Sequence, residues 1–216
     1  MRYLIFVILL VIIGCNSIKL REEEKNNLKA ELEEMVKIDQ LAANNAGPPK
    51  EYGYLSNEKW IVFKDSVFTS NKTKAEKAFN KYGFLGFDLV GKEGSKDFWL
   101  VIQHSDKYPD FQKEVLKKMK TEVRKNNANP QNYAYLYDRV ALNTENKQLY
   151  GTQVEYNKFG QAVPKKMQDS VHVDSRRTKY KLENLKDYLN TMTKMHFEMN
   201  KEYFIKKGIN EPKLYK

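Results

Sequence analysis

A histidine stands at the end of the helix that is predicted to be the most buried in this 216-residue chain, where packing alone does not demand a polar side chain. His104 lies four residues after Leu100, so it shares the apolar face of a helix that contains residues 98–102. A partly desolvated imidazole suits general acid–base work, because its unperturbed pKa of about 6.5 lies near neutral pH. The alternative is a histidine that caps the helix C-terminus or satisfies a buried carbonyl group.

An aspartate interrupts a second apolar segment, which is rich in tyrosine. Asp138 on such a helix needs a partner, because an unpaired buried carboxylate is costly. The partner is either Arg139 beside it or a histidine from a neighbouring helix. A buried Asp–His pair would be a functional arrangement, and a structural ion pair is an equal alternative. The catalytic hypothesis takes His104 as general base or acid and Asp138 as the group that orients it.

Four further polar residues are candidates for substrate binding or orientation. Gln153 ends a glycine-bearing segment that allows the close approach of a ligand, although a simple hairpin bulge has the same pattern. Arg139, Arg176 and Arg177 carry guanidinium groups that match carboxylate or phosphate with two hydrogen bonds, although a surface salt bridge also explains Arg176 and Arg177. We expect Gln153 and at least one of these arginines to converge with the two catalytic candidates on one pocket.

Several common site motifs are absent from the sequence. It contains no zinc-protease HExxH, no serine-hydrolase GxSxG, no phosphate-binding glycine loop and no calcium loop. Its three histidines, His104, His172 and His196, show no paired metal-ligand spacing. We therefore expect no metal ligands, and no cofactor is evident.

The first residues have the pattern of an export signal. Arg2 precedes an apolar run over residues 3–13, which is too short to span a bilayer permanently. Cys15, the only cysteine, follows at once, as in a bacterial lipobox. An ordinary signal peptide with an incidental cysteine is the alternative. We expect residues 1–14 to be a signal peptide and residues 15–19 a lipidated cysteine and tether. The chain would then be exported and held on a bacterial membrane by its lipid, on the periplasmic side rather than the cell surface.

Composition narrows the class of protein. The chain is 41% hydrophobic and 31% charged, which excludes a disordered tail, and one cysteine excludes a disulfide framework. Its net charge of +10 favours contact with an anionic membrane surface. We expect no nucleic-acid partner, because the basic residues are scattered and an exported protein does not meet DNA.

The elements that must position these residues are mostly helices. Apolar residues recur at spacings of three and four over 20–43, and a Gly-Pro-Pro sequence follows. The fold class expected is mainly α: a single compact multi-helix domain over residues 20–216 with a small β-hairpin excursion. After the helix over residues 20–43 we expect an irregular segment over residues 50–70 with a short strand at 60–63, a helix over 71–82 capped by Asn71, and a loop over 86–94. A helix capped by Ser95 and helices over 109–125 and 130–142 should follow. The chain should end with a hairpin arm at 147–156 and helices over 172–178 and 182–206.

The order of short motifs resembles the bacterial family catalogued as domain of unknown function 6624. The motifs are Asp39-Gln40, Lys81-Tyr82-Gly83-Phe84, Leu89-Val90-Gly91, Trp99 to Asp106, Phe111-Gln112, Ala134 to Val140, Gln148 to Gln153 and Val173 to Arg177. The resemblance covers about residues 30–190. It carries no established activity, but it implies that the polar residues form a shared pocket, to which it adds Gln40. The chain departs from the family at residues 84–86, where a tryptophan–proline pair is usual, and residues 44–70 are enlarged by aromatic residues.

Two functions from different classes follow. The first is a hydrolase or transferase that acts on an anionic envelope molecule, with Gln40 and Gln153 holding the substrate and the arginines binding its charge. The second is a non-catalytic envelope lipoprotein that binds a ligand or partner through the aromatic stretch 52–68 and the basic surface. The first is favoured if the His104 and Asp138 side chains lie within hydrogen-bond reach of each other in a water-accessible cleft that also holds an arginine. A His104 side chain sealed in the core counts against it.

Overall fold

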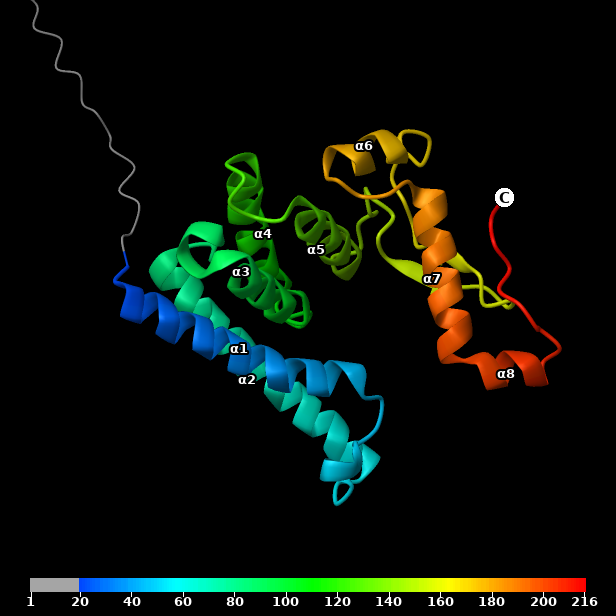
Figure 1. Ribbon diagram of the computed structural model, residues 1–216, viewed down its shortest axis with the longest axis horizontal. Coiled ribbons are helices and arrows are strands. Elements are labelled where there is room, and N and C mark those ends of the chain that lie inside the picture. Colours follow the sequence, from blue (N-terminus) through cyan, green and yellow to red (C-terminus); the bar gives the residue numbers. More distant parts are fainter. Residues whose placement is uncertain (1–19) are drawn as a thin grey trace, which may run out of the picture.

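The computed structural model describes residues 20–216, so the predicted signal peptide (1–14) and the predicted lipid attachment at Cys15 lie outside the described residues. Five helices form an N-terminal bundle, and a hairpin and three helices form a C-terminal part beyond it (Figure 1). The prediction of a mainly helical fold with one small hairpin is confirmed. The helices are α1 (Glu22–Asn44), α2 (Asn57–Tyr82), α3 (Phe87–Gln103), α4 (Pro109–Arg124), α5 (Pro130–Asn143), α6 (Val173–Lys179), α7 (Leu185–Met199) and α8 (Lys201–Lys206), with a 3-10 turn at Lys50–Tyr52 and strands β1 (Val154–Tyr156) and β2 (Ala162–Pro164).

Helices α1 and α2 run side by side along the bundle (Figure 1). Each buries a stripe with helical spacing, and each stripe contains one polar residue: Asp39 in α1 and Asn71 in α2. The Asn71 side chain donates a hydrogen bond to the carbonyl of Met35 at 3.0 Å, so a buried amide joins the two helices. This contact explains why a polar residue is tolerated within the stripe.

The start of α2 corrects two predictions. The strand expected at 60–63 is helical, and Asn71 is an interior residue rather than a cap. The hydroxyl of Ser56 is the actual cap, accepting a hydrogen bond from the amide of Lys59 at 3.3 Å. The β-branched and aromatic residues at 60–63 favour a strand locally, but Trp60 is fully buried on the same helical face as Val67. Tertiary packing therefore overrides local propensity.

Helix α3 occupies the segment predicted as a glycine loop. It runs from Phe87 to Gln103 and bends at Gly91, whose φ of 72° and ψ of −179° lie in a region essentially reserved for glycine. Ser95 is buried inside this helix and does not start it. The glycines therefore mark a kink at which two helical segments meet.

Helices α4 and α5 begin at Pro109 and Pro130, as the sequence predicted. The side chain of Asn129 caps α5 by accepting hydrogen bonds from two backbone amides. The core of the bundle is a continuous cluster of apolar side chains from α1 to α5, including Leu32, Phe98 and Leu136.

The C-terminal part is smaller. Strands β1 and β2 pair antiparallel, with Glu155 opposite Val163, and β2 packs against α7. The hairpin therefore starts later than the predicted arm at 147–156, and residues 149–152 form a loop. The single helix predicted at 182–206 is interrupted at Asn200, which separates α7 from α8. No helix in residues 20–216 combines the length and the apolar character needed to cross a membrane.

Substitution of Gly91 by alanine tests the kink in α3. A Cβ atom at this φ is strained, so the free energy of unfolding should fall by about 1–3 kcal/mol, measured by urea denaturation. Lys92→Ala, at an exposed neighbour in the same helix, is the matched control and should change it by less than about 0.5 kcal/mol. Equal effects of the two substitutions would contradict the assignment.

Candidate functional site

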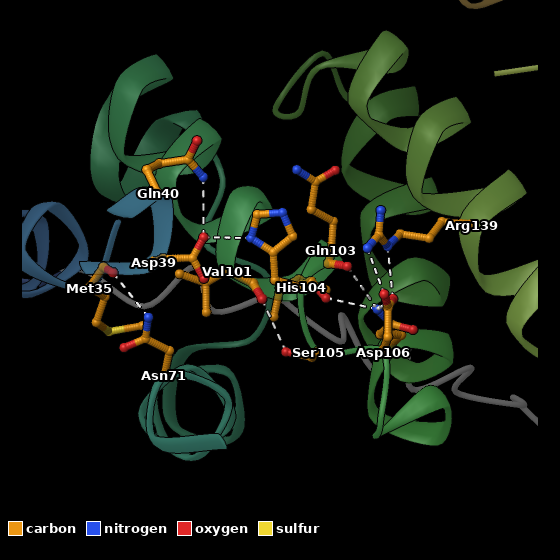
Figure 2. Close-up of polar contacts among 12 residues, drawn as sticks. Met35, Asp39, Gln40, Asn71, Val101, Gln103, His104, Ser105, Asp106 and Arg139 are labelled. Carbon is orange, nitrogen blue, oxygen red and sulfur yellow. Dashed lines mark hydrogen bonds and ion pairs between the residues drawn. The ribbon is translucent and has the colours of Figure 1, made fainter. Parts of the chain in front are cut away.

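The central feature of the site is a pair between Asp39 of α1 and His104 at the end of α3 (Figure 2). His104 Nδ1 lies 2.5 Å from Asp39 Oδ2. The aspartate is fully buried, whereas 16% of the histidine side chain is exposed. Because a carboxylate only accepts hydrogen bonds, Nδ1 is the donor, which leaves Nε2 as the free nitrogen of the neutral ring.

Gln40 completes this arrangement on the aspartate. Its Nε2 donates a hydrogen bond to the same Asp39 Oδ2 at 3.2 Å (Figure 2). The other oxygen, Oδ1, is buried and has no hydrogen-bond partner among the described residues. The sequence interpretation assigned Gln40 to a substrate, and the structure places it against the carboxylate that holds His104.

The end of α3 is held in place from α4. Gln112 of α4 is fully buried, and its Nε2 donates to the carbonyls of Ile102 at 3.0 Å and Gln103 at 3.4 Å. These carbonyls belong to the last turn of α3, where i+4 helical donors are lacking, and the Ile102 carbonyl also accepts from the Ser105 amide at 3.1 Å. A side chain from a different helix therefore caps α3 directly before His104 and holds the backbone that carries the imidazole in position.

His104 opens onto a cleft of about 370 Å³. Residues of α1, α2, α5 and the α3–α4 connection line it: Ala42, Ala43, Lys64, Asp65, Phe68, Thr69, His104, Asp106, Lys107, Tyr108 and Arg139. The Phe68 ring lies 5.5 Å from the imidazole, between ring centroids. Three permanent cations and two carboxylates line the cleft, so an anion is favoured there.

Arg139 contributes one of these cations through a two-point ion pair. Its Nε and Nη2 donate to the two carboxylate oxygens of Asp106 at 2.8 and 2.6 Å (Figure 2). Asn143 and Gln112 also donate to Asp106. Burial alone would raise the pKa of Asp106, but the hydrogen bond and charge of Arg139 outweigh it and hold that pKa below its ordinary value. Arg139 Nη1 has no partner in residues 20–216 and remains available to a ligand.

Asp138 does not pair with His104, and this part of the catalytic hypothesis is corrected. The carboxylate is fully buried and accepts hydrogen bonds from the backbone amides of Leu149, Tyr150 and Thr152 and from the Thr152 hydroxyl, at 2.8 to 3.2 Å. Burial raises the pKa of Asp138 above its ordinary value, and these hydrogen bonds oppose the rise. Asp138 therefore organises a loop.

The expected convergence of His104, Asp138, Gln153 and an arginine on one pocket is wrong, because only His104 and Arg139 of the predicted residues line the cleft. Arg177 is fully buried and donates to the carbonyls of Tyr150 and Glu183, both at 2.6 Å. Arg176 donates to the carbonyl of Leu149 at 2.9 Å and pairs with Asp169. The Gln153 backbone amide donates to the Gln148 side chain. Gln153, Arg176 and Arg177 do not line the cleft, whereas His104 and Arg139 do.

Asp39 and Gln112 are the site residues that the sequence interpretation missed. Asp39 continues the buried α1 stripe of Leu28, Leu32 and Met35, so a carboxylate on an apolar stripe was a usable signal. Gln112 likewise lies on the buried α4 stripe with Val115 and Met119, and it stands in the Phe111-Gln112 motif, so a local signal was present there too. In the described part of the chain, no group of three or more His, Cys, Asp or Glu side chains is placed to hold a metal ion.

The fold and site define a helical protein with a buried Asp–His pair at the floor of a cationic cleft. The sequence model of a family of unknown function (DUF6624) matches residues 27–198, and the chain belongs to this family. The resemblance drawn from the motifs is thereby confirmed. Comparison with curated proteins gave no match, and neither did comparison with solved structures.

Replacement of Asp138 by asparagine tests its structural role. An amide group cannot accept the full set of hydrogen bonds, so the free energy of unfolding should fall by about 3 kcal/mol, measured by urea denaturation. Asp110→Asn is the control, since the Asp110 side chain is 93% exposed. This substitution should change the free energy of unfolding by less than about 0.5 kcal/mol. A loss at Asp138 no larger than in the control would refute the role.

Proposed function

We propose that the His104 cleft performs general acid–base chemistry on an anionic substrate, as a hydrolase or transferase. The observation that carries this proposal is the 2.5 Å contact between His104 Nδ1 and the buried Asp39 Oδ2 in a cleft that also contains Arg139. A carboxylate behind an imidazole fixes its tautomer and stabilises the imidazolium form that appears when Nε2 takes up a proton.

The roles follow from this geometry. Nε2 of His104 takes a proton from an attacking water or hydroxyl group, and the resulting imidazolium returns the proton to the leaving group. Asp39 is a positioning residue that acts through His104, and Gln40 supports it from the other side. Arg139 Nη1, with Lys64 and Lys107 in the same lining, binds the negative charge of the substrate. The site needs no contribution from Asp138, Gln153, Arg176 or Arg177.

A non-catalytic binding function is the second candidate, and a different surface favours it. Tyr52 lies in a cluster of rings with Tyr54, Trp60 and Phe63, at centroid distances of 5.0 to 6.2 Å. A groove of about 700 Å³ runs between Tyr52, Tyr54 and α1. This surface belongs to the aromatic stretch 52–68, to which the sequence interpretation assigned a ligand or partner.

We also propose that the chain works at a bacterial membrane as an exported lipoprotein. The support is the sequence pattern of residues 1–15, in which an apolar run ends at the only cysteine. Lipid attached at Cys15 would place the cleft near envelope molecules, many of which are anionic.

Substitution of His104 by glutamine tests the catalytic proposal. Turnover should be screened on phosphoester, carboxylic ester and amide substrates that carry a negative charge, and the variant should lower it by roughly 10²–10⁴-fold. His172→Gln is the matched control, because His172 forms an exposed pair with Asp169 at 3.0 Å, and it should keep full activity. Unfolding curves of both variants should overlay that of the parent chain. A His104→Gln variant with undiminished turnover, or one that unfolds, would exclude the catalytic assignment.

Substitution of Cys15 by serine tests the lipid anchor. Serine lacks the thiol to which diacylglycerol attaches, so cells fed a clickable fatty acid should label the parent chain and not the variant. The variant should also escape lipoprotein-specific cleavage and keep residues 1–14, as mass spectrometry would show. Equal fatty-acid label on both chains would rule out Cys15 as the attachment site.

A further inference from the structure

Exposed apolar side chains are frequent in the part of the chain around α8, a helix that lies at one end of the molecule (Figure 1). Seven of the eleven large apolar residues that are exposed in residues 20–216 come from the β1–β2 hairpin, α7, α8 and the tail: Tyr156, Phe159, Met195, Met199, Tyr203, Ile205 and Leu214. Single exposed apolar residues are ordinary, but a local concentration of them marks an interaction surface.

Contacts around Phe204 join part of this set into a continuous surface. Phe204 is buried, and its ring lies 5.4 Å from those of His196 and Tyr203. His196 in turn stacks on Tyr156 at a centroid distance of 3.7 Å. A Cβ atom built on Gly160 would lie 2.4 Å from Phe204, so the backbone of the hairpin packs directly on this ring. We call Tyr156, His196 and Tyr203, together with Phe204, the Phe204 patch. The exposed Phe159 precedes Gly160 in the same hairpin.

Lysines surround the Phe204 patch. Lys158 and Lys213 lie over the Phe159 ring, at 5.0 and 4.4 Å from its centroid, and Lys207 lies 4.4 Å from that of Tyr203. In the described part of the chain, none of these three ammonium groups has a carboxylate partner. Residues 195–216 carry five lysines and three glutamates, one of which, Glu198, pairs with Lys201. The local charge is therefore positive.

We propose that the Phe204 patch docks on an anionic lipid bilayer. Aromatic rings with a polar edge lie at the boundary between headgroups and acyl chains, and lysines bind anionic headgroups while their stems cover apolar surface. The charge complementarity favours a bilayer with anionic lipid over a neutral one. This contact belongs to α8 and the hairpin, so it is independent of the cleft at His104 and of the proposed lipid at Cys15.

The test measures which surface of the full chain touches lipid. Cys15→Ser removes the only cysteine, and Tyr203→Cys then carries a single bimane fluorophore at a side chain that is 54% exposed. The protein is reconstituted into vesicles of phosphatidylethanolamine and phosphatidylglycerol that contain nitroxide-labelled lipid. Bimane at 203 should be quenched and blue-shifted. The control is Val62→Cys, at a side chain on α2 that is 68% exposed. Bimane attached there should be neither quenched nor blue-shifted.

Charge and folding are controlled in the same experiment. Lys207→Glu with Lys213→Glu should remove most of the quenching at 203, because each lysine near an anionic surface strengthens the contact about fivefold. Vesicles of phosphatidylcholine alone should quench 203 weakly. Met199→Cys, at a side chain that is 81% exposed, replaces Tyr203→Cys if the latter alters the circular dichroism spectrum. Absent quenching, equal quenching at 62, or equal quenching on neutral vesicles would overturn the proposal, and absent quenching would favour a protein partner for the patch.

Discussion

The buried carboxylate of Asp138 holds the loop 149–152 against α5 with hydrogen bonds to three backbone amides and one hydroxyl group. The loop in turn presents the carbonyls of Leu149 and Tyr150 to Arg176 and Arg177 of α6. One anion, one loop and two guanidinium groups therefore help to join the C-terminal part to the bundle. Ring contacts of Tyr133 with Tyr180 and of Tyr135 with Tyr188 join the two parts as well.

The two aspartates that interrupt apolar helix stripes have different hydrogen-bond partners. Asp138 is satisfied by backbone amides, which do not titrate, and this makes it part of the scaffold. Asp39 contacts an imidazole through one carboxylate oxygen, and that imidazole reaches the cleft. The same residue type in similar burial thus holds a loop in one helix and an imidazole in the other, and the partner makes the difference.

The sequence predicted the helices correctly where local signals agree with tertiary packing. Prolines at 109 and 130 start α4 and α5, and the periodicity of α1 is plain. Local propensity misled at residues 60–63 and at Gly91, where tertiary contacts decide. His104 was identified because it stands on an apolar face. The partner of His104 was not identified, because the choice between Asp39 and Asp138 depends on how α1 packs against α3. No short-range sequence pattern records that packing.

The capping of α3 by Gln112 has a consequence for the order of folding. Asp39 and His104 lie 65 residues apart along the chain, and the end of α3 gains its cap only when α4 docks. Until then, burial of the α1 stripe leaves the Asp39 carboxylate without its imidazole, which opposes that burial. The pair is therefore assembled only when elements that are distant in the sequence have packed together. We expect partly folded chains to contain helices without the assembled Asp39–His104 pair.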